Sequence, residues 1–195
     1  MKVGILAVQG DFEAHSKVFA RLNVPWTFVR RPPDLADVDG LVLPGGESTT
    51  FLKLLADEGL LEEIRRMPAA SRPLFGTCAG AILLASEVTN PPQPSLGLID
   101  ITVARNAYGR QIASSVVLGE CSLKEDPLEM VFIRAPVIER VGEGVEVLAW
   151  REARPVFVRQ GMVMATTFHP ELTADTTVHE YFLRMVRTPT ASARR

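Results

Sequence analysis

The chain has 195 residues, of which 47% are hydrophobic, and its formal net charge at pH 7 is -2. This length and composition predict one domain with a full hydrophobic core, spanning residues 1–195, with residues 188–195 as a flexible tail. The small net charge gives no electrostatic case for binding nucleic acid or an anionic membrane, and no apolar stretch is long enough to span a bilayer.

The first 85 residues alternate between short apolar runs and amphipathic stretches. The apolar runs predict buried strands at residues 2–8, 27–30, 40–43 and 73–75. The amphipathic stretches predict helices at residues 12–22, 49–66 and 79–85. In the second helix, Ser48 is the expected N-cap and Gly59 an expected break. This βα alternation predicts a parallel sheet with helices on both faces and ligands at the C-terminal strand ends.

The pattern changes after residue 87, where the chain becomes rich in predicted strands. Residues 90–94 contain three prolines and predict a loop within the domain rather than a linker. Residues 145–150 alternate as a half-buried strand does. Residues 156–159 and 162–167 predict a hairpin that turns at Gln160-Gly161, and residues 174–187 predict a closing amphipathic helix.

A cysteine framed by glycines is the first candidate catalytic residue. Cys78 lies between Gly76 and Gly80, after an apolar run and before a helical one. Glycines two positions away on both sides permit the sharp strand-to-helix turn that presents a nucleophile. The thiol is then expected at a helix N-terminus, where the helix dipole and free backbone N–H groups favour the thiolate.

His169 and Glu171 offer a base and a carboxylate to orient it. They are two positions apart, and on an extended strand such residues project to the same face. A carboxylate beside an imidazole holds one tautomer, as a catalytic triad requires. Each segment alone has a more common explanation, since a lone cysteine is usually a small buried residue and a histidine is usually structural. Their joint presence favours a Cys-His-Glu triad.

Six segments carry a resemblance to a known family, at residues 3–10, 43–50, 76–80, 105–111, 132–136 and 168–173. The Gly-Thr-Cys-Ala-Gly and His-Pro-Glu segments resemble those of the class I, triad-type glutamine amidotransferases. The Gly-Gly-Glu-Ser-Thr-Thr, Arg-Asn-Ala-Tyr-Gly-Arg-Gln and Phe-Ile-Arg-Ala-Pro segments are similar to those of the glutaminase subunits of pyridoxal 5'-phosphate synthase.

The resemblance implies an α/β, class I glutamine amidotransferase-like (flavodoxin-like) fold, with a mostly parallel central sheet flanked by helices and a β-rich C-terminal half. It implies that the chain is a single glutaminase domain that hydrolyses L-glutamine to L-glutamate and ammonia with Cys78, His169 and Glu171. The ammonia is expected to reach a synthase subunit that makes pyridoxal 5'-phosphate (vitamin B6) in a hetero-oligomeric complex, with Gln9 as a candidate partner contact. No cofactor is implied for the glutaminase itself.

The resemblance also implies an oxyanion hole and a set of substrate-binding residues. The expected oxyanion donors are backbone N–H groups of Ala79 and of the loop at Gly46. The expected substrate-binding residues are Gly46, Glu47, Ser48, Arg105, Ile133 and Arg134. An arginine can bind the α-carboxylate of glutamine bidentately, and Glu47 is a candidate for its α-ammonium. A surface salt bridge is the alternative explanation for Arg105 and Arg134.

Three other functions stay open on the sequence alone. Another class I amidotransferase subunit, such as that of histidine biosynthesis, would keep the triad with a different acceptor. A cysteine peptidase or chaperone-like hydrolase of related fold usually has its histidine directly after the nucleophile, where this chain has Ala79. Intact Cys78, His169 and Glu171 disfavour a non-catalytic binding module. Because Cys78 and Cys121 cannot form a disulfide framework or a metal site with the three histidines, a cytoplasmic protein without bound metal is expected.

Overall fold

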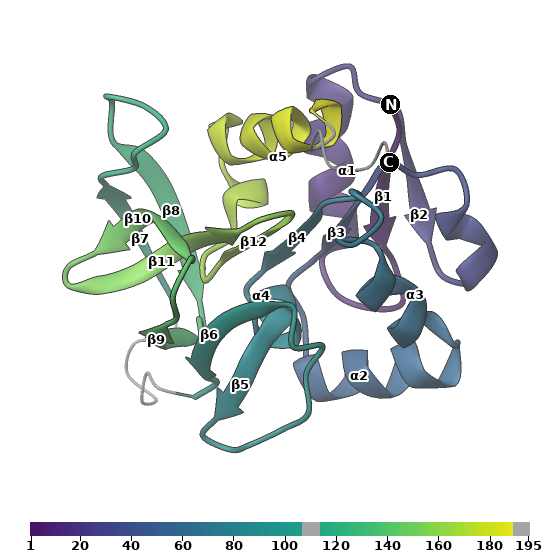
Figure 1. Cartoon of the computed structure of the whole chain (residues 1–195). Helices are drawn as coiled ribbons and strands as arrows, with labels where there is room; N and C mark the ends of the chain where they lie inside the picture. The colour runs from purple at the N-terminus through teal and green to yellow at the C-terminus, as the bar shows by residue number, and fades with distance from the viewer. Residues whose placement is uncertain (107–113, 189–195) are drawn as a thin grey trace.

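A computed structural model of the chain describes residues 1–106 and 114–188 (Figure 1). Its strands are β1 Val3–Leu6, β2 Trp26–Val29, β3 Gly40–Leu43, β4 Leu74–Thr77, β5 Ala85–Thr89, β6 Ile99–Ala104, β7 Ser114–Gly119, β8 Leu128–Ile133, β9 Val137–Val141, β10 Glu146–Arg151, β11 Arg154–Gln160 and β12 Val163–Thr166. Its helices are α1 Phe12–Arg21, α2 Ser48–Asp57, α3 Leu60–Arg66, α4 Ala79–Leu84 and α5 Thr177–Arg187, with short 3-10 turns η1 Pro32–Leu35 and η2 Pro170–Leu172.

A seven-stranded sheet forms the centre of the molecule, with the strand order β10-β11-β12-β4-β3-β1-β2. The strands from β2 to β12 pair in parallel, whereas β11 and β10 add antiparallel pairs at one edge. The remaining strands form a three-stranded sheet, β5-β6-β9, and a two-stranded sheet, β7-β8. The expected mostly parallel sheet and β-rich C-terminal half are therefore confirmed.

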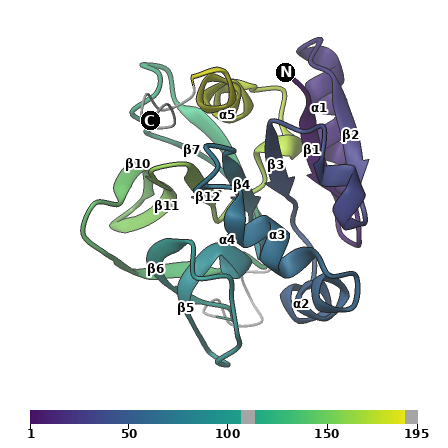
Figure 2. The same ribbon diagram turned by 45° about the vertical axis from the view of Figure 1, so that its right-hand side comes forward.

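Helices cover both faces of the sheet, with α1 and α5 on one face and α2, α3 and α4 on the other (Figures 1 and 2). Successive residues of β3 point to opposite faces: Leu41 and Leu43 pack in the core beneath α2 to α4, and Val42 packs in the core beneath α1 and α5. Burial on both faces explains why the central strands are continuous apolar runs in the sequence.

The N-terminus of α2 differs from the expected one. Ser48 is the first residue of α2 rather than its cap, and the cap is Glu47. The Glu47 carboxylate accepts hydrogen bonds from the backbone N–H groups of Thr49 and Thr50, which have no partner within the helix. Gly59, with a φ of +71°, separates α2 from α3 as predicted, because a left-handed residue ends the first helix.

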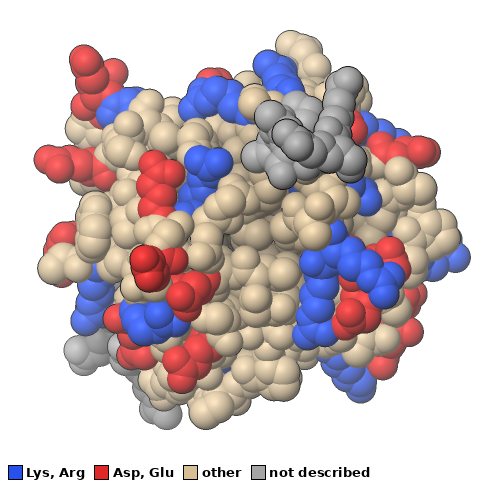
Figure 3. Space-filling view, viewed as in Figure 1, with Lys and Arg blue, Asp and Glu red and all other residues tan. Residues whose placement is uncertain are grey.

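Two sequence predictions concern parts of the chain outside the described residues. These are most of the 105–111 segment and, apart from Thr188, the tail at residues 188–195. On the face shown in Figure 3, acidic and basic side chains are interspersed and neither sign forms a continuous patch. In the described ranges, every helix is too short or too polar to cross a bilayer.

Candidate active site

Cys78 occupies a strained turn between β4 and α4. Its φ of 49° and ψ of -101° place a non-glycine residue in a φ range that L-amino acids rarely adopt. Its N–H donates to the carbonyl of Thr166 in β12 at 2.8 Å, and its carbonyl accepts from Ala81 and Ile82 at the start of α4. These bonds fix the thiol at the C-terminal edge of the sheet and the N-terminus of α4.

Both glycines that frame Cys78 are required by close backbone contacts. A Cβ atom on Gly80 would collide with the carbonyl of Leu43 in β3. A Cβ atom on Gly76 would come within 2.6 Å of the backbone of Gly80. The glycine frame therefore allows α4 to start directly above β3 and β4.

His169 and Glu171 contact each other through a tight turn and not through an extended strand. β12 ends at Thr166, and Pro170 begins η2, so the expected same-face strand geometry is wrong. Proline is suited to the first position of such a turn because its φ is already close to helical. The turn places Nδ1 of His169 2.8 Å from Oε1 of Glu171, so the predicted pair forms by a different route.

The surroundings of this pair favour a positive imidazole beside a negative carboxylate. Burial alone would lower the pKa of His169, but hydrogen bonds with Cys78 and Glu171 and the charge on Glu171 raise it to about 10. Burial alone would raise the pKa of Glu171, but the neighbouring His15 and His169 hold it below its ordinary value. The imidazole can therefore carry a proton at neutral pH.

The raised pKa of His169 predicts a specific pH dependence of stability. The folded protein holds this proton more tightly than the unfolded chain, so the stabilisation is complete below the ordinary histidine pKa of 6.5 and is lost as the pH rises through about 10. We expect the free energy of unfolding, measured in urea, to fall between pH 7 and pH 10 by more in the wild type than in His169→Asn. Parallel pH profiles for the two proteins would contradict this interpretation.

A pocket of about 370 Å³ lies over the Cys78 turn, a size suited to a small-molecule ligand. Its lining residues are Gly46, Glu47, Ser48, Cys78, Ala79, Ile82, Arg105, Asn106, Ile133, Arg134 and His169. The structure thus brings together all the predicted site residues except Glu171 and Gln9, each of which contacts a lining residue, His169 and Glu47 respectively. Ile82 and Asn106 were not expected, and only their position beside the motifs could have suggested them.

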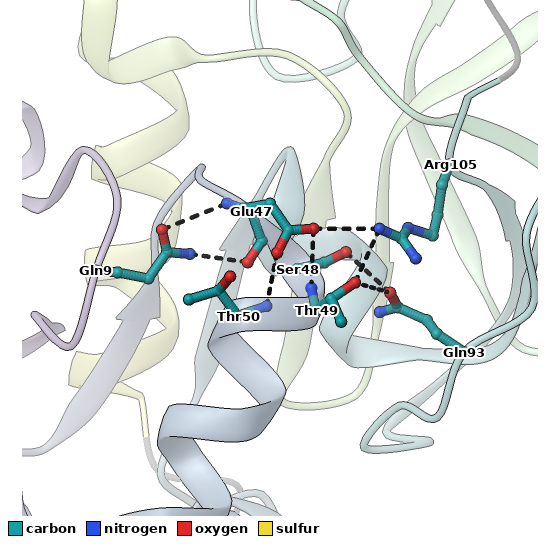
Figure 4. Close-up of polar contacts among 7 residues, drawn as sticks. All are labelled: Gln9, Glu47, Ser48, Thr49, Thr50, Gln93 and Arg105. Atoms are coloured by element: carbon teal, nitrogen blue, oxygen red, sulfur yellow. Dashed lines mark hydrogen bonds and ion pairs between the residues drawn. The ribbon is translucent and has the colours of Figure 1, made fainter.

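Glu47 and Arg105 bind each other at the rim of the pocket (Figure 4). Nη2 of Arg105 lies 3.2 Å from the same Glu47 oxygen that accepts from the N–H of Thr49. Burial would raise the pKa of Glu47, but hydrogen bonds from Thr50 and Thr49 lower it, so the carboxylate stays charged. Arg105 therefore forms a salt bridge, which was the alternative explanation for this residue. The salt bridge lies within the predicted substrate site.

Two glutamines hold the loop that carries Glu47 (Figure 4). Gln9, which follows β1, donates to the carbonyl of Glu47 at 3.0 Å and accepts from its N–H at 3.4 Å. Gln93, which follows β5, accepts from the hydroxyl of Ser48 at 3.0 Å and from that of Thr49 at 3.5 Å. Gln9 is therefore bonded to the loop that carries Glu47, and its contact with a partner subunit stays a prediction.

Sequence reasoning missed two histidines behind Glu171. His15 lies on α1 and His179 on α5, and both side chains are fully buried. His15 shares an apolar helical face with Phe12 and Phe19, a spacing that predicts burial but not contact with a carboxylate from another element. Across the described ranges, no group of three or more His, Cys, Asp and Glu side chains is arranged to hold a metal ion.

Comparison with known proteins identifies the family. Residues 5–188 match the SNO glutamine amidotransferase family. The chain belongs to this family. This amidotransferase is 60% identical over 187 residues to pyridoxal 5'-phosphate synthase subunit PdxT of Koribacter versatilis, with 96% of each chain covered. It is 49% identical over 187 residues to the PdxT subunit of Thermosipho africanus, with 96% of this chain and 100% of that one covered.

The fold of this amidotransferase is also that of solved relatives. A crystal structure of a glutamine amidotransferase matches with a TM-score of 0.89 and 48% sequence identity, covering 95% of this chain and 99% of that one. The match confirms the class I glutamine amidotransferase fold, and family membership confirms the resemblance drawn from the motifs. The peptidase or chaperone-like hydrolase alternative is therefore excluded.

Proposed function

We propose that this amidotransferase hydrolyses L-glutamine with a Cys78-His169-Glu171 triad and supplies the ammonia to a synthase subunit that makes pyridoxal 5'-phosphate. The observation that carries the proposal is that Cys78 and His169 line one pocket, with Glu171 2.8 Å behind the imidazole. The names of the two PdxT relatives support the synthase. The proposal includes a single glutaminase domain in the cytoplasm, where reducing conditions preserve the free thiols of Cys78 and Cys121.

The triad positions fit a two-step acyl transfer. The Cys78 thiolate attacks the side-chain amide carbon of glutamine and forms a tetrahedral intermediate. His169 gives a proton to the nitrogen as the C–N bond breaks, which releases ammonia and leaves a glutamyl thioester. Water then attacks the thioester carbonyl, His169 accepts its proton, and glutamate leaves with the thiolate restored. Glu171 stabilises the imidazolium at each protonated stage.

Backbone groups beside Cys78 suit the oxyanion of both intermediates. Ala79 is the first residue of α4, so its N–H has no partner within the helix. A second donor from the loop at Gly46 would complete an oxyanion hole, since Gly46 lines the same pocket. A single such donor typically contributes about two to three orders of magnitude to turnover.

The polar ends of glutamine have matching groups at the rim. Arg134 and Arg105 offer guanidinium groups to the α-carboxylate, and the charged Glu47 carboxylate offers an acceptor to the α-ammonium. The backbone at Gly46, Ser48 and Ile133 completes the expected set. Glu47 and Arg105 already form an ion pair. The α-carboxylate and the α-ammonium of glutamine can therefore bind to two opposite charges that lie side by side.

An assay of ammonia and glutamate release from L-glutamine tests the proposal. We expect one glutamate per ammonia, and faster turnover when a pyridoxal 5'-phosphate synthase subunit is added, with little change in KM. The synthase can fix an oxyanion donor in place through Gln9 and the loop that Gln9 holds. Such a donor stabilises mainly the transition state, so turnover should change more than KM. Absence of ammonia release by the complex would overturn the proposed glutaminase activity. Full turnover without the synthase would overturn only the proposed activation by the synthase.

A further inference from the structure

A chain of buried polar side chains lies directly behind the triad. Nδ1 of His15 is 3.0 Å from Nε2 of His179. Nε2 of His15 is 3.3 Å from the Thr77 hydroxyl and 3.6 Å from Oε1 of Glu171. Thr77 is the residue before Cys78, and Glu171 is the residue that holds the imidazole of His169. This cluster therefore contacts the carboxylate of the triad and the residue that precedes its nucleophile.

The two histidines are neutral in this position. Phenylalanine rings surround them: Phe75 lies edge-on to both imidazoles and Phe19 lies edge-on to that of His179. Burial lowers the pKa of His179 to about 3. Burial also lowers the pKa of His15, although the charge on Glu171 opposes the shift. Each ring therefore has one N–H group. Its position on His15 determines whether the Glu171 carboxylate faces an N–H group or a nitrogen lone pair.

Only one pair of tautomers suits the charges. If Nε2 of His15 carries the hydrogen, it points toward the Glu171 carboxylate and the Thr77 oxygen, while Nδ1 accepts from Nε2–H of His179. The opposite pair would direct a ring lone pair at a buried carboxylate. It would also place a hydrogen on Nδ1 of His179, a buried atom that has no hydrogen-bond partner in the part of the chain that the structure describes. The favoured pair therefore directs N–H groups in sequence from α5 toward Glu171.

We propose that His15, held in its tautomer by His179, is a positioning residue that keeps the Glu171 carboxylate charged and directed at His169. The inference rests on the proposed triad. Among the described residues, buried Oε2 of Glu171 has no hydrogen-bond partner, so the carboxylate contacts its neighbours through Oε1. Nε2–H of His15, 3.6 Å from that oxygen, attracts the charged carboxylate electrostatically and so opposes the rotation that would break its contact with His169.

Loss of the His15 N–H should change the pKa of Glu171 in a predictable direction. Glu171 faces His15 from α1 and His169 from its own turn. The charge on Asp11 raises the pKa of His15, and the charge on Arg21 lowers the pKa of His179. Replacing His15 by an apolar residue removes an N–H from the charged form of Glu171, so the pKa of Glu171 rises. The carboxylate is then protonated at a higher pH. Because the triad needs the charged form, the acid limb of kcat/KM moves to higher pH.

Three full-length variants, assayed for ammonia release with the synthase present, test the role. In His15→Leu we expect kcat to fall about tenfold, as for outer partners of functional histidines, with KM for glutamine within about twofold. The acid limb should move up by about one pH unit or more. His15→Gln, whose amide N–H can replace Nε2–H, should restore most of kcat and the wild-type acid limb. Val18→Ala is the matched control, since Val18 is a buried residue of α1 without polar groups.

Equal kcat and equal acid limbs in His15→Leu and Val18→Ala would overturn the proposal, because both would then report packing alone. Nitrogen-15 NMR of the unmodified wild type gives a test that needs neither a folded variant nor activity. The ring nitrogens of His15 and His179 should both show the Nε2–H tautomer between pH 6 and pH 8. A protonated Nδ1 on His15 would overturn the proposal even if the triad is correct. Failure of the wild type to release ammonia would instead overturn the proposed function.

Discussion

Replacement of Cys78 by alanine is expected to lower kcat for glutamine hydrolysis by more than about 10⁴-fold, since the members of a triad act as a unit. The sulfur is the nucleophile that attacks glutamine in the first step of the proposed mechanism, and no acyl intermediate can form without it. The fold should persist, because alanine keeps the Cβ atom and the backbone bonds that shape the turn. Ammonia release with the synthase present, together with a thermal unfolding curve, measures both expectations.

Cys121 gives the matched control for this prediction. It is buried, and burial raises the pKa of its thiol, so it has little thiolate at neutral pH. We expect Cys121→Ala to keep wild-type turnover. A glutamine-like chloroketone should alkylate Cys78 and spare Cys121 in peptide mapping. Wild-type turnover in a folded Cys78→Ala variant, or label on Cys121, would show that the nucleophile is wrongly assigned.

The elements that sequence predicts best here are those whose pattern reflects burial. Residues 40–43 form a strand as expected because they pack against helices on both sides of the sheet. The glycine frame of Cys78 was equally informative, because close backbone contact at Gly76 and Gly80 excludes any other residue. Where a local pattern has one physical cause, the sequence predicts the structure well.

The elements that it misses depend on contacts between distant segments. Glu47 caps α2 in place of Ser48, and its carboxylate is held there in part by Arg105, which is far away in the sequence. The contact of His15 with Glu171 joins α1 to the turn after β12. No spacing rule links residues that far apart, so an apolar helix face predicts the burial of His15 but not its partner.

Loss of His169 should be nearly as severe as loss of Cys78, whereas Glu171→Gln should be milder. His169→Asn removes the group that moves protons in both steps, but Glu171→Gln leaves an amide oxygen that can still accept from Nδ1–H. We expect Glu171→Gln to retain roughly ten to a hundred times more activity than His169→Asn, because the orienting member of a triad usually costs less. Steady-state kcat with the synthase present measures the difference. Small, equal effects of both changes would point to another base, but neither His15 nor His179 lines the pocket.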